Sequence, residues 1–199
     1  NDPRLPMYAR DAPLTGTIVG KPYGLGSFTN INEYSRASGK AYSTTFPGII
    51  ISYAEVQFAL AEAAARGFNV GGDAETFYEN GIRASMKFWG VDDAAADAFV
   101  AGNPYDENNW KNILGPQKWV ALYNQGLQGW FVRTRLDFSK PDGTDFFIAP
   151  VTILDPSVTF VPYRLTYPIG EKSNNAQNYQ QAASAMGGDV KGFKLWWQQ

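Results

Sequence analysis

The 199-residue chain contains neither cysteine nor histidine. Without cysteine it has no disulfides, no thiolate metal ligands, no thiol nucleophile and, within these residues, no acylation site for a lipid anchor. Without histidine, Ser-His-Asp triads, imidazole acid–base catalysis and histidine-ligated metals are excluded. We therefore predict no catalytic residue, no metal site and no cofactor.

Charge is also scarce. Charged residues make up 18% of the chain, the formal net charge is −2, and lysine and arginine form no run. A nucleic-acid surface normally needs a clustered basic patch, so this partner is disfavoured. No apolar run approaches the roughly 20 residues that span a bilayer. The start, residues 1–6, lacks both regions of a signal peptide, and we expect a fragment of a longer protein.

Hydrophobic residues account for 44% of the chain and aromatics for 15%, beside 20 glycines and 12 prolines. This composition predicts a packed core in which helices alternate with long irregular loops. We divide the chain into a loop-rich segment 1–47, a helical scaffold 48–136 and a loop-rich C-terminal segment 137–199. In the first segment, residues 16–20 are expected to pair briefly as a strand.

A first helix is predicted from Ser52 to Gly67. Ser52 precedes Glu55 by three residues, which is a capping box: the Glu55 amide donates to the Ser52 hydroxyl, and the carboxylate reaches back. Apolar residues then recur at helical spacing, and Gly67 ends the helix. Alanines between Ala59 and Ala65 leave little side-chain bulk, so a neighbouring helix should approach closely.

A second helix is predicted from its N-cap Asp73 to Gly90, and the pair resembles a tetratricopeptide (TPR) unit. Asp92 or Asp93 is expected to cap a short third helix.

A fourth helical region is predicted from about Glu107 to Arg135. Pro116 must either kink it or begin a new helix. Gly126 and Gly129 are expected to permit close packing on the alanine-rich helix. A short polar helix is predicted from about residue 175 to 186.

Several sequence blocks together resemble the SusD/RagB family. They are Ser52–Ala64 with the following Gly-Gly-Asp, Tyr78–Ile82, Gln117–Tyr123, Gly126-Leu127 with Trp130, Pro162–Leu165, Gly187–Asp189 and Leu195–Trp197. The blocks keep the family's order, and Asp2-Pro3-Arg4-Leu5-Pro6 resembles an upstream segment. Two departures are the interruption at Gly115-Pro116 and the absence of the family's N-terminal half with its lipid-modified cysteine.

The resemblance implies an all-α fold of TPR-like helical hairpins packed with long irregular loops, of which residues 1–199 would be the C-terminal portion. It implies a non-enzymatic, starch-binding-type lipoprotein at the cell surface of the outer membrane. Such a protein binds an oligosaccharide or peptide nutrient and delivers it to a SusC-like TonB-dependent transporter. The expected partners are this transporter, the glycan or peptide, and the missing N-terminal portion. A TPR-type protein–protein interaction scaffold is the alternative, and a glycosidase fragment a distant third.

Carboxylates are the first candidates for chemistry. Glu55 and Glu62 lie seven residues apart on one helix face, whereas a glycosidase needs two carboxylates facing each other across a bond, so we interpret them as structural. Asp92, Asp93 and Asp97 lack the spacing of a calcium loop and are better explained by a helix cap.

Aromatic residues in loops are the better candidates, because sugars stack on exposed rings beside polar donors and acceptors. The predicted ligand-binding residues are Tyr23, Phe28, Asn30, Tyr34 and Arg36. The segment 142–155, with Phe146 and Phe147, is a second possibility. The tryptophans on helix faces are expected to belong to the core.

Overall fold

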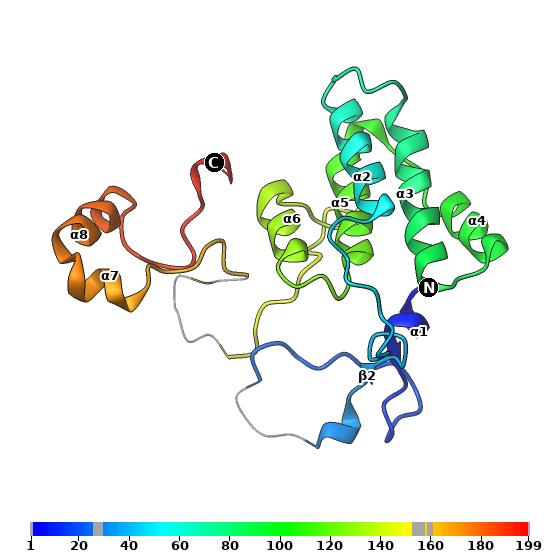
Figure 1. The fold of residues 1–199 in the computed structure, drawn as a ribbon, viewed down its shortest axis with the longest axis horizontal. Coiled ribbons are helices and arrows are strands. Elements are labelled where there is room, and N and C mark those ends of the chain that lie inside the picture. The colour runs from blue at the N-terminus through cyan, green and yellow to red at the C-terminus, as the bar shows by residue number, and fades with distance from the viewer. Residues whose placement is uncertain (1, 26–29, 153–157, 159–160, 199) are drawn as a thin grey trace. The chain divides into compact units, whose positions relative to one another are not determined.

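The computed structural model describes residues 2–25, 30–152, 158 and 161–198 (Figure 1). The chain divides into two compact units. Unit 1 comprises Asn1–Lys21 and Thr29–Phe146, and unit 2 comprises Pro22–Phe28 and Phe147–Gln199. The fold is mainly helical, as predicted.

Unit 1 contains most of the secondary structure. Its elements are α1 (Leu5–Tyr8), β1 (Ala9–Arg10), η1 (Ile31–Glu33), β2 (Arg36–Ala37), α2 (Tyr53–Ala65), α3 (Ala74–Trp89), α4 (Asp93–Ala101), η2 (Glu107–Asn109), α5 (Trp110–Ala121) and α6 (Gln128–Leu136). The strands β1 and β2 pair antiparallel, with Ala9 opposite Ala37. The strand expected at residues 16–20 does not form; Val19 instead exchanges two hydrogen bonds with Ser35, through its backbone amide and carbonyl.

The predicted caps start three consecutive helices. The Glu55 amide donates to Ser52 Oγ at 3.1 Å, and Asp73 and Asp92 accept from amides in the first turns of α3 and α4. The prediction that the Glu55 carboxylate reaches back to the start of the helix is wrong. Glu55 Oε2 is buried without a hydrogen-bond partner among the described residues. Gly90, with φ 88°, ends α3 as expected.

Helices α2 and α3 pack side by side as a hairpin (Figure 1). Phe58 of α2 is fully buried and lies against Gly81 of α3, where a Cβ would come within 2.8 Å of the Phe58 ring. Ala54 and Ala61 are also buried on α2. The small side chains predicted to allow close approach are therefore supplied by both helices.

The predicted fourth helical region is two helices. It breaks between Ala121 and Gln128, where Asn124 and Gly126 adopt positive φ values of 65° and 57°. Pro116 begins no new helix, because α5 continues through it. Gly126 therefore serves the turn, where no side chain approaches it, and Gly129 packs against Trp119 of α5 instead of the alanine-rich helix.

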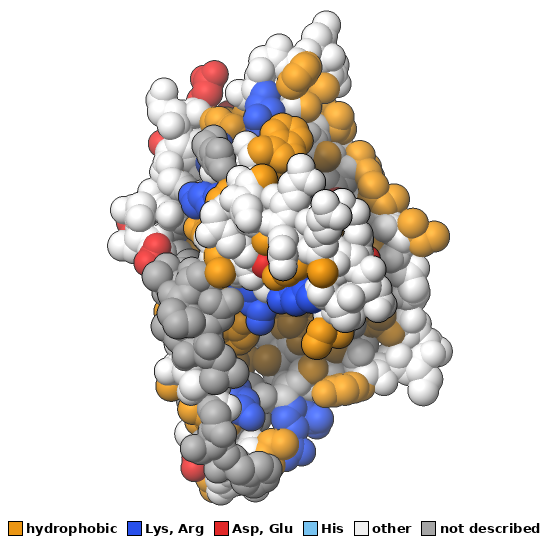
Figure 2. Space-filling view, turned by 90° about the vertical axis from the view of Figure 1, so that its left-hand side faces the viewer, with side chains coloured by type: hydrophobic (Ala, Val, Ile, Leu, Met, Phe, Trp, Pro, Cys, Tyr) orange, Lys and Arg blue, Asp and Glu red, His pale blue; other side chains and the backbone are white. Residues whose placement is uncertain are grey.

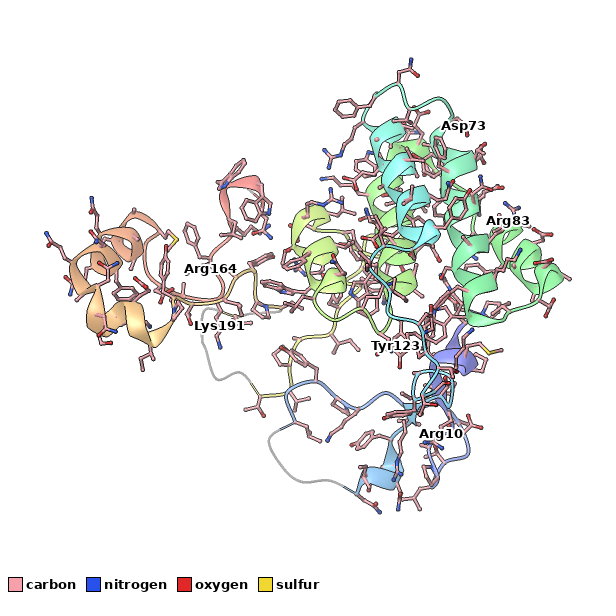
Figure 3. All side chains as sticks on the ribbon, in the orientation of Figure 1. Arg10, Asp73, Arg83, Tyr123, Arg164 and Lys191 are labelled. Carbon is pink, nitrogen blue, oxygen red and sulfur yellow. The ribbon has the colours of Figure 1, made fainter. Side chains whose placement is uncertain are left out.

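Unit 2 contains α7 (Ile169–Asn174), α8 (Ala176–Ala185) and η3 (Trp196–Gln198). Helix α8 confirms the predicted polar helix. In unit 2, the carboxylate of Asp189 forms ion pairs with Arg164 Nη1 at 2.9 Å and with Lys172 Nζ at 3.3 Å; Arg164 is labelled in Figure 3. Among the described residues of the whole chain, no helix has both the length and the apolarity needed to cross a membrane.

Candidate functional site

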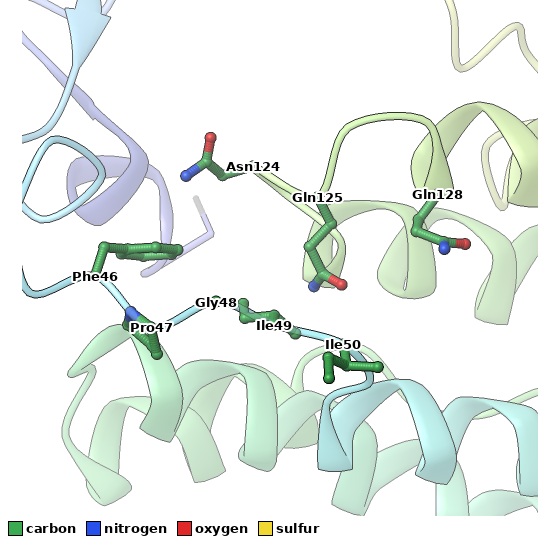
Figure 4. A pocket seen from close by; sticks show the side chains of 8 residues that line it. All are labelled: Phe46, Pro47, Gly48, Ile49, Ile50, Asn124, Gln125 and Gln128. Atoms are coloured by element: carbon green, nitrogen blue, oxygen red, sulfur yellow. The ribbon is translucent and has the colours of Figure 1, made fainter.

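A cavity of about 460 Å³ lies in unit 1 between the segment that leads into α2 and the turn that joins α5 to α6 (Figure 4). Its lining residues are Phe46, Pro47, Gly48, Ile49 and Ile50 on one wall and Asn124, Gln125 and Gln128 on the other. We call this cavity the amide pocket. One wall is apolar and carries an aromatic ring, and the other presents three side-chain amides.

Phe46 is held in the apolar wall by aromatic neighbours from α3. Its ring centroid lies 6.1 Å from that of Phe88, edge to face, and 5.8 Å from that of Trp89. Trp89 is itself almost completely buried. These contacts restrict the orientation of the Phe46 ring in the wall of the pocket.

The amide wall is anchored on the same aromatic cluster through Tyr123, which immediately precedes Asn124. Tyr123 stacks on Tyr8 at 4.3 Å and packs against Trp89 at 5.6 Å. The Tyr123 hydroxyl donates to the Tyr8 carbonyl, and the Tyr8 hydroxyl donates to the Val120 carbonyl. Both walls of the pocket therefore rest on Trp89 and its partners.

The three amides have unused hydrogen-bonding capacity. In the part of the chain that the structure describes, the side chains of Asn124, Gln125 and Gln128 make no hydrogen bond to protein. In Figure 4 the Gln125 amide extends toward Gly48 and Ile49 across the pocket. Each amide offers two donors and an acceptor. None of the eight lining residues is charged or titratable, so the pocket suits a neutral, hydroxyl- or amide-rich ligand.

A second cavity, of about 670 Å³, lies at the turn between α2 and α3. Its lining includes the carboxylates of Asp73, Glu75 and Glu107 and the aromatic rings of Phe68 and Tyr105. Asp73 is already used as the cap of α3. Because this cavity is acidic, it suits a cationic ligand and is less compatible with a neutral one.

The predicted ligand-binding residues are divided between the two units of the chain. Asn30, Tyr34 and Arg36 lie in unit 1, Tyr23 belongs to unit 2, and Phe28 lies outside the described residues. Asn30 caps η1 by accepting from the Asn32 amide, and Arg36 donates to Asn32 Oδ1 at 3.1 Å. Tyr23 is 55% exposed. Phe146, from the second predicted segment, packs against Trp119 and Phe138 in unit 1.

Asp92 caps α4 as expected, and two other carboxylates form ion pairs. Glu62 binds Arg135 and Lys118, and Asp97 binds Arg83. Over the described residues, no group of three or more potential metal-ligating side chains occurs.

The amide pocket was not predicted from the sequence. Its amides lie in a region predicted to be helical, and Phe46 lies in the segment 1–47, which was predicted to be rich in loops. The signal that was available is the string Asn124-Gln125-Gly126, because asparagine and glycine are the residues that most readily adopt positive φ.

The chain belongs to the SusD-like family described as "Starch-binding associating with outer membrane", whose family model matches residues 1–168. A search of curated proteins found no match.

Solved structures match over essentially the whole chain. A SusD homologue from Bacteroides thetaiotaomicron is 22% identical with a TM-score of 0.82 and is matched over 100% of this chain and 49% of its own. A SusD-like protein from the same organism is 27% identical with a TM-score of 0.76, over 99% and 47%. A chitin-binding protein is 27% identical with a TM-score of 0.70, over 100% and 47%. The chain thus spans about half the length of each of these relatives.

Proposed function

We propose that the protein binds a neutral oligosaccharide at the outer membrane, without chemical turnover, and that the amide pocket contributes to this binding. The nutrient would then pass to a SusC-like TonB-dependent transporter. The protein would be held at the cell surface by a lipid anchor on the N-terminal portion. The observation that carries the proposal is a preformed pocket with an aromatic ring, three uncommitted amides and no charge.

The chemistry of this lining fits sugars. Amide side chains hydrogen-bond to hydroxyl groups as both donors and acceptors, and an aromatic ring offers an apolar surface to a pyranose face. None of the lining residues supplies a nucleophile or a general acid. Membership of a family named for starch binding supports the same ligand class, as does the similarity to a chitin-binding protein.

Calorimetric titration with two neutral oligosaccharides, maltoheptaose and chitohexaose, tests the proposal. We expect one of them to bind and Gln125→Ala to weaken that binding about tenfold, which corresponds to the loss of about 1.4 kcal/mol. Asn108→Ala is the matched control: Asn108 carries an exposed amide in η2 and does not line the pocket. Its affinity should be unchanged.

A second pair of variants tests the aromatic wall. Phe46→Ala should weaken binding, whereas Phe68→Ala, which removes an exposed ring at the turn between α2 and α3, should leave it unchanged. Thermal unfolding of each variant separates lost contacts from lost folding. Binding of a neutral hexapeptide in place of both sugars, or equal effects of the paired variants, would contradict the proposal.

The cluster predicted from the sequence remains a second proposed contact region. Tyr34 and Arg36 lie in the loop-rich part of unit 1, near Asn30 along the chain, and Tyr23 exposes more than half of its surface. Tyr34→Ala and Tyr23→Ala, assayed with the same sugars, test it independently of the amide pocket.

A further inference from the structure

Six large apolar side chains of unit 1 are exposed around two of its helices. Ile50, Ile51, Tyr53 and Val56 come from α2 and the residues before it, and Leu127 and Phe131 from α6 and the residue before it. Their exposed fractions run from 37% for Val56 to 95% for Ile50. We call this surface the α2–α6 face. Figure 2 shows hydrophobic side chains exposed among polar ones on the face that it draws.

The two helices are neighbours at both ends. Near their starts, Ile50 and Gln128 line the same cavity. Further along, Arg135 of α6 donates to Glu62 Oε2 of α2 at 2.6 Å. Helices α2 and α6 therefore approach each other near both of their ends and run in the same direction, while α2 packs on α3 and α5, and α6 packs on α5.

Helix α2 carries apolar residues both on the side that packs within unit 1 and on a side that stays exposed. Its inner positions, Ala54, Phe58 and Ala61, are buried, and it packs against α3 and α5. Tyr53 and Val56, three residues apart on another side, are apolar and exposed. A helix that is hydrophobic all round is typical of a buried position, and contiguous exposed apolar patches mark interaction surfaces.

We propose that the α2–α6 face is the surface on which the remaining half of the same protein packs. The structural relatives match this chain along its whole length, yet it accounts for only 47–49% of theirs. They therefore contain about as much polypeptide again. An apolar face of this kind is what a core leaves when part of it is removed. The amide pocket, which shares Ile50 with this face, then lies at its edge.

The inference rests on the family relation and not on the proposed ligand, so the two can fail separately. The absence of cysteine from residues 1–199 provides the assay. Tyr53→Cys, Val56→Cys and Phe131→Cys report on the face. Phe68→Cys is the matched control, because Phe68 is 65% exposed, close to the 66% of Tyr53, and lies at the turn between α2 and α3.

Each variant is made in the complete protein and treated with a maleimide, and the labelling rate is read by mass spectrometry of the peptide that contains the new cysteine. We expect the three face positions to label at least tenfold more slowly than Phe68→Cys in the native protein, and all four at equal rates in urea. Equal rates at all four positions in the native protein would overturn the inference. Protection that disappears on dilution would also overturn it, because the occupant would then be a second copy of the chain.

Discussion

At the scale of single residues, Glu62 is a buried carboxylate held by three basic side chains of unit 1. It is 5% exposed and binds Arg135, Lys118 and Arg66. Burial alone would raise the pKa of its carboxyl group. The hydrogen bond and charge of Arg135, assisted by Lys118 and Arg66, outweigh burial and lower this pKa from 4.5 to about 2.

This lowered pKa predicts how stability depends on pH. Glu62 binds protons more tightly in the unfolded chain, so its contribution is complete above about pH 4.5 and is lost as the pH falls toward 2. Glu62→Gln should lower the free energy of unfolding by about 3 kcal/mol at pH 7, since it leaves Lys118 buried without its counter-charge. Urea denaturation of both proteins at pH 7 and pH 3 measures the difference, which should shrink at pH 3.

Glu79→Gln is the control for this experiment. Glu79 forms a partly exposed pair with Arg83, and such pairs contribute less than about 1 kcal/mol. Similar losses in the two variants would show that burial of the Glu62 cluster is not the cause.

Arg4 gives a structural role to the segment Asp2-Pro3-Arg4-Leu5-Pro6. It is fully buried, forms an ion pair with Asp2 at 2.6 Å, and donates to Gln117 Oε1 and Ser85 Oγ. Its guanidinium also lies over the ring of Phe99. One side chain therefore fastens the start of the chain to α3, α4 and α5, which a planar group with five donors is suited to do.

At the scale of elements, the hairpin of α2 and α3 depends on the contact between Gly81 and Phe58. A Cβ at Gly81 would lie 2.8 Å from the Phe58 ring, which is fully buried. Gly81→Ala should therefore destabilise the protein by about 1–3 kcal/mol, despite the better helix propensity of alanine.

Gly102→Ala is the comparison, because Gly102 has a φ of −82° and a Cβ there would come no closer than 3.5 Å to another atom. Chemical denaturation of both variants should give a midpoint near that of the unchanged protein only for Gly102→Ala. A stable Gly81→Ala protein would mean that the two helices can separate without cost.

Helices with local start and stop signals were predicted closely. Ser52, Asp73 and Asp92 cap the helices that follow them because a cap joins atoms only three residues apart. The break between α5 and α6 was missed. Apolar residues continue at helical spacing across it, so the periodic pattern outweighed the local signal of Asn124 and Gly126.

At the scale of the whole molecule, the amide pocket predicts that ligand binding does not depend on pH. None of its eight lining residues titrates between pH 6 and pH 8. The affinity for a bound oligosaccharide should therefore differ by less than twofold between these pH values in calorimetric titration. A change of tenfold or more would place an ionising group in the site and contradict the assignment.

The sequence by itself determined the class of protein: a mainly helical, SusD-like chain without histidine or cysteine chemistry. These conclusions rest on residue types, local caps and motif order, which do not require the chain to be folded. Tertiary structure alone decided that Phe46 and Gln125 line one pocket, that Arg135 reaches Glu62 across 73 positions, and that apolar side chains of α2 and α6 remain exposed. The physical reason is that such contacts depend on how helices pack, and packing is set by the shapes of all the side chains between them.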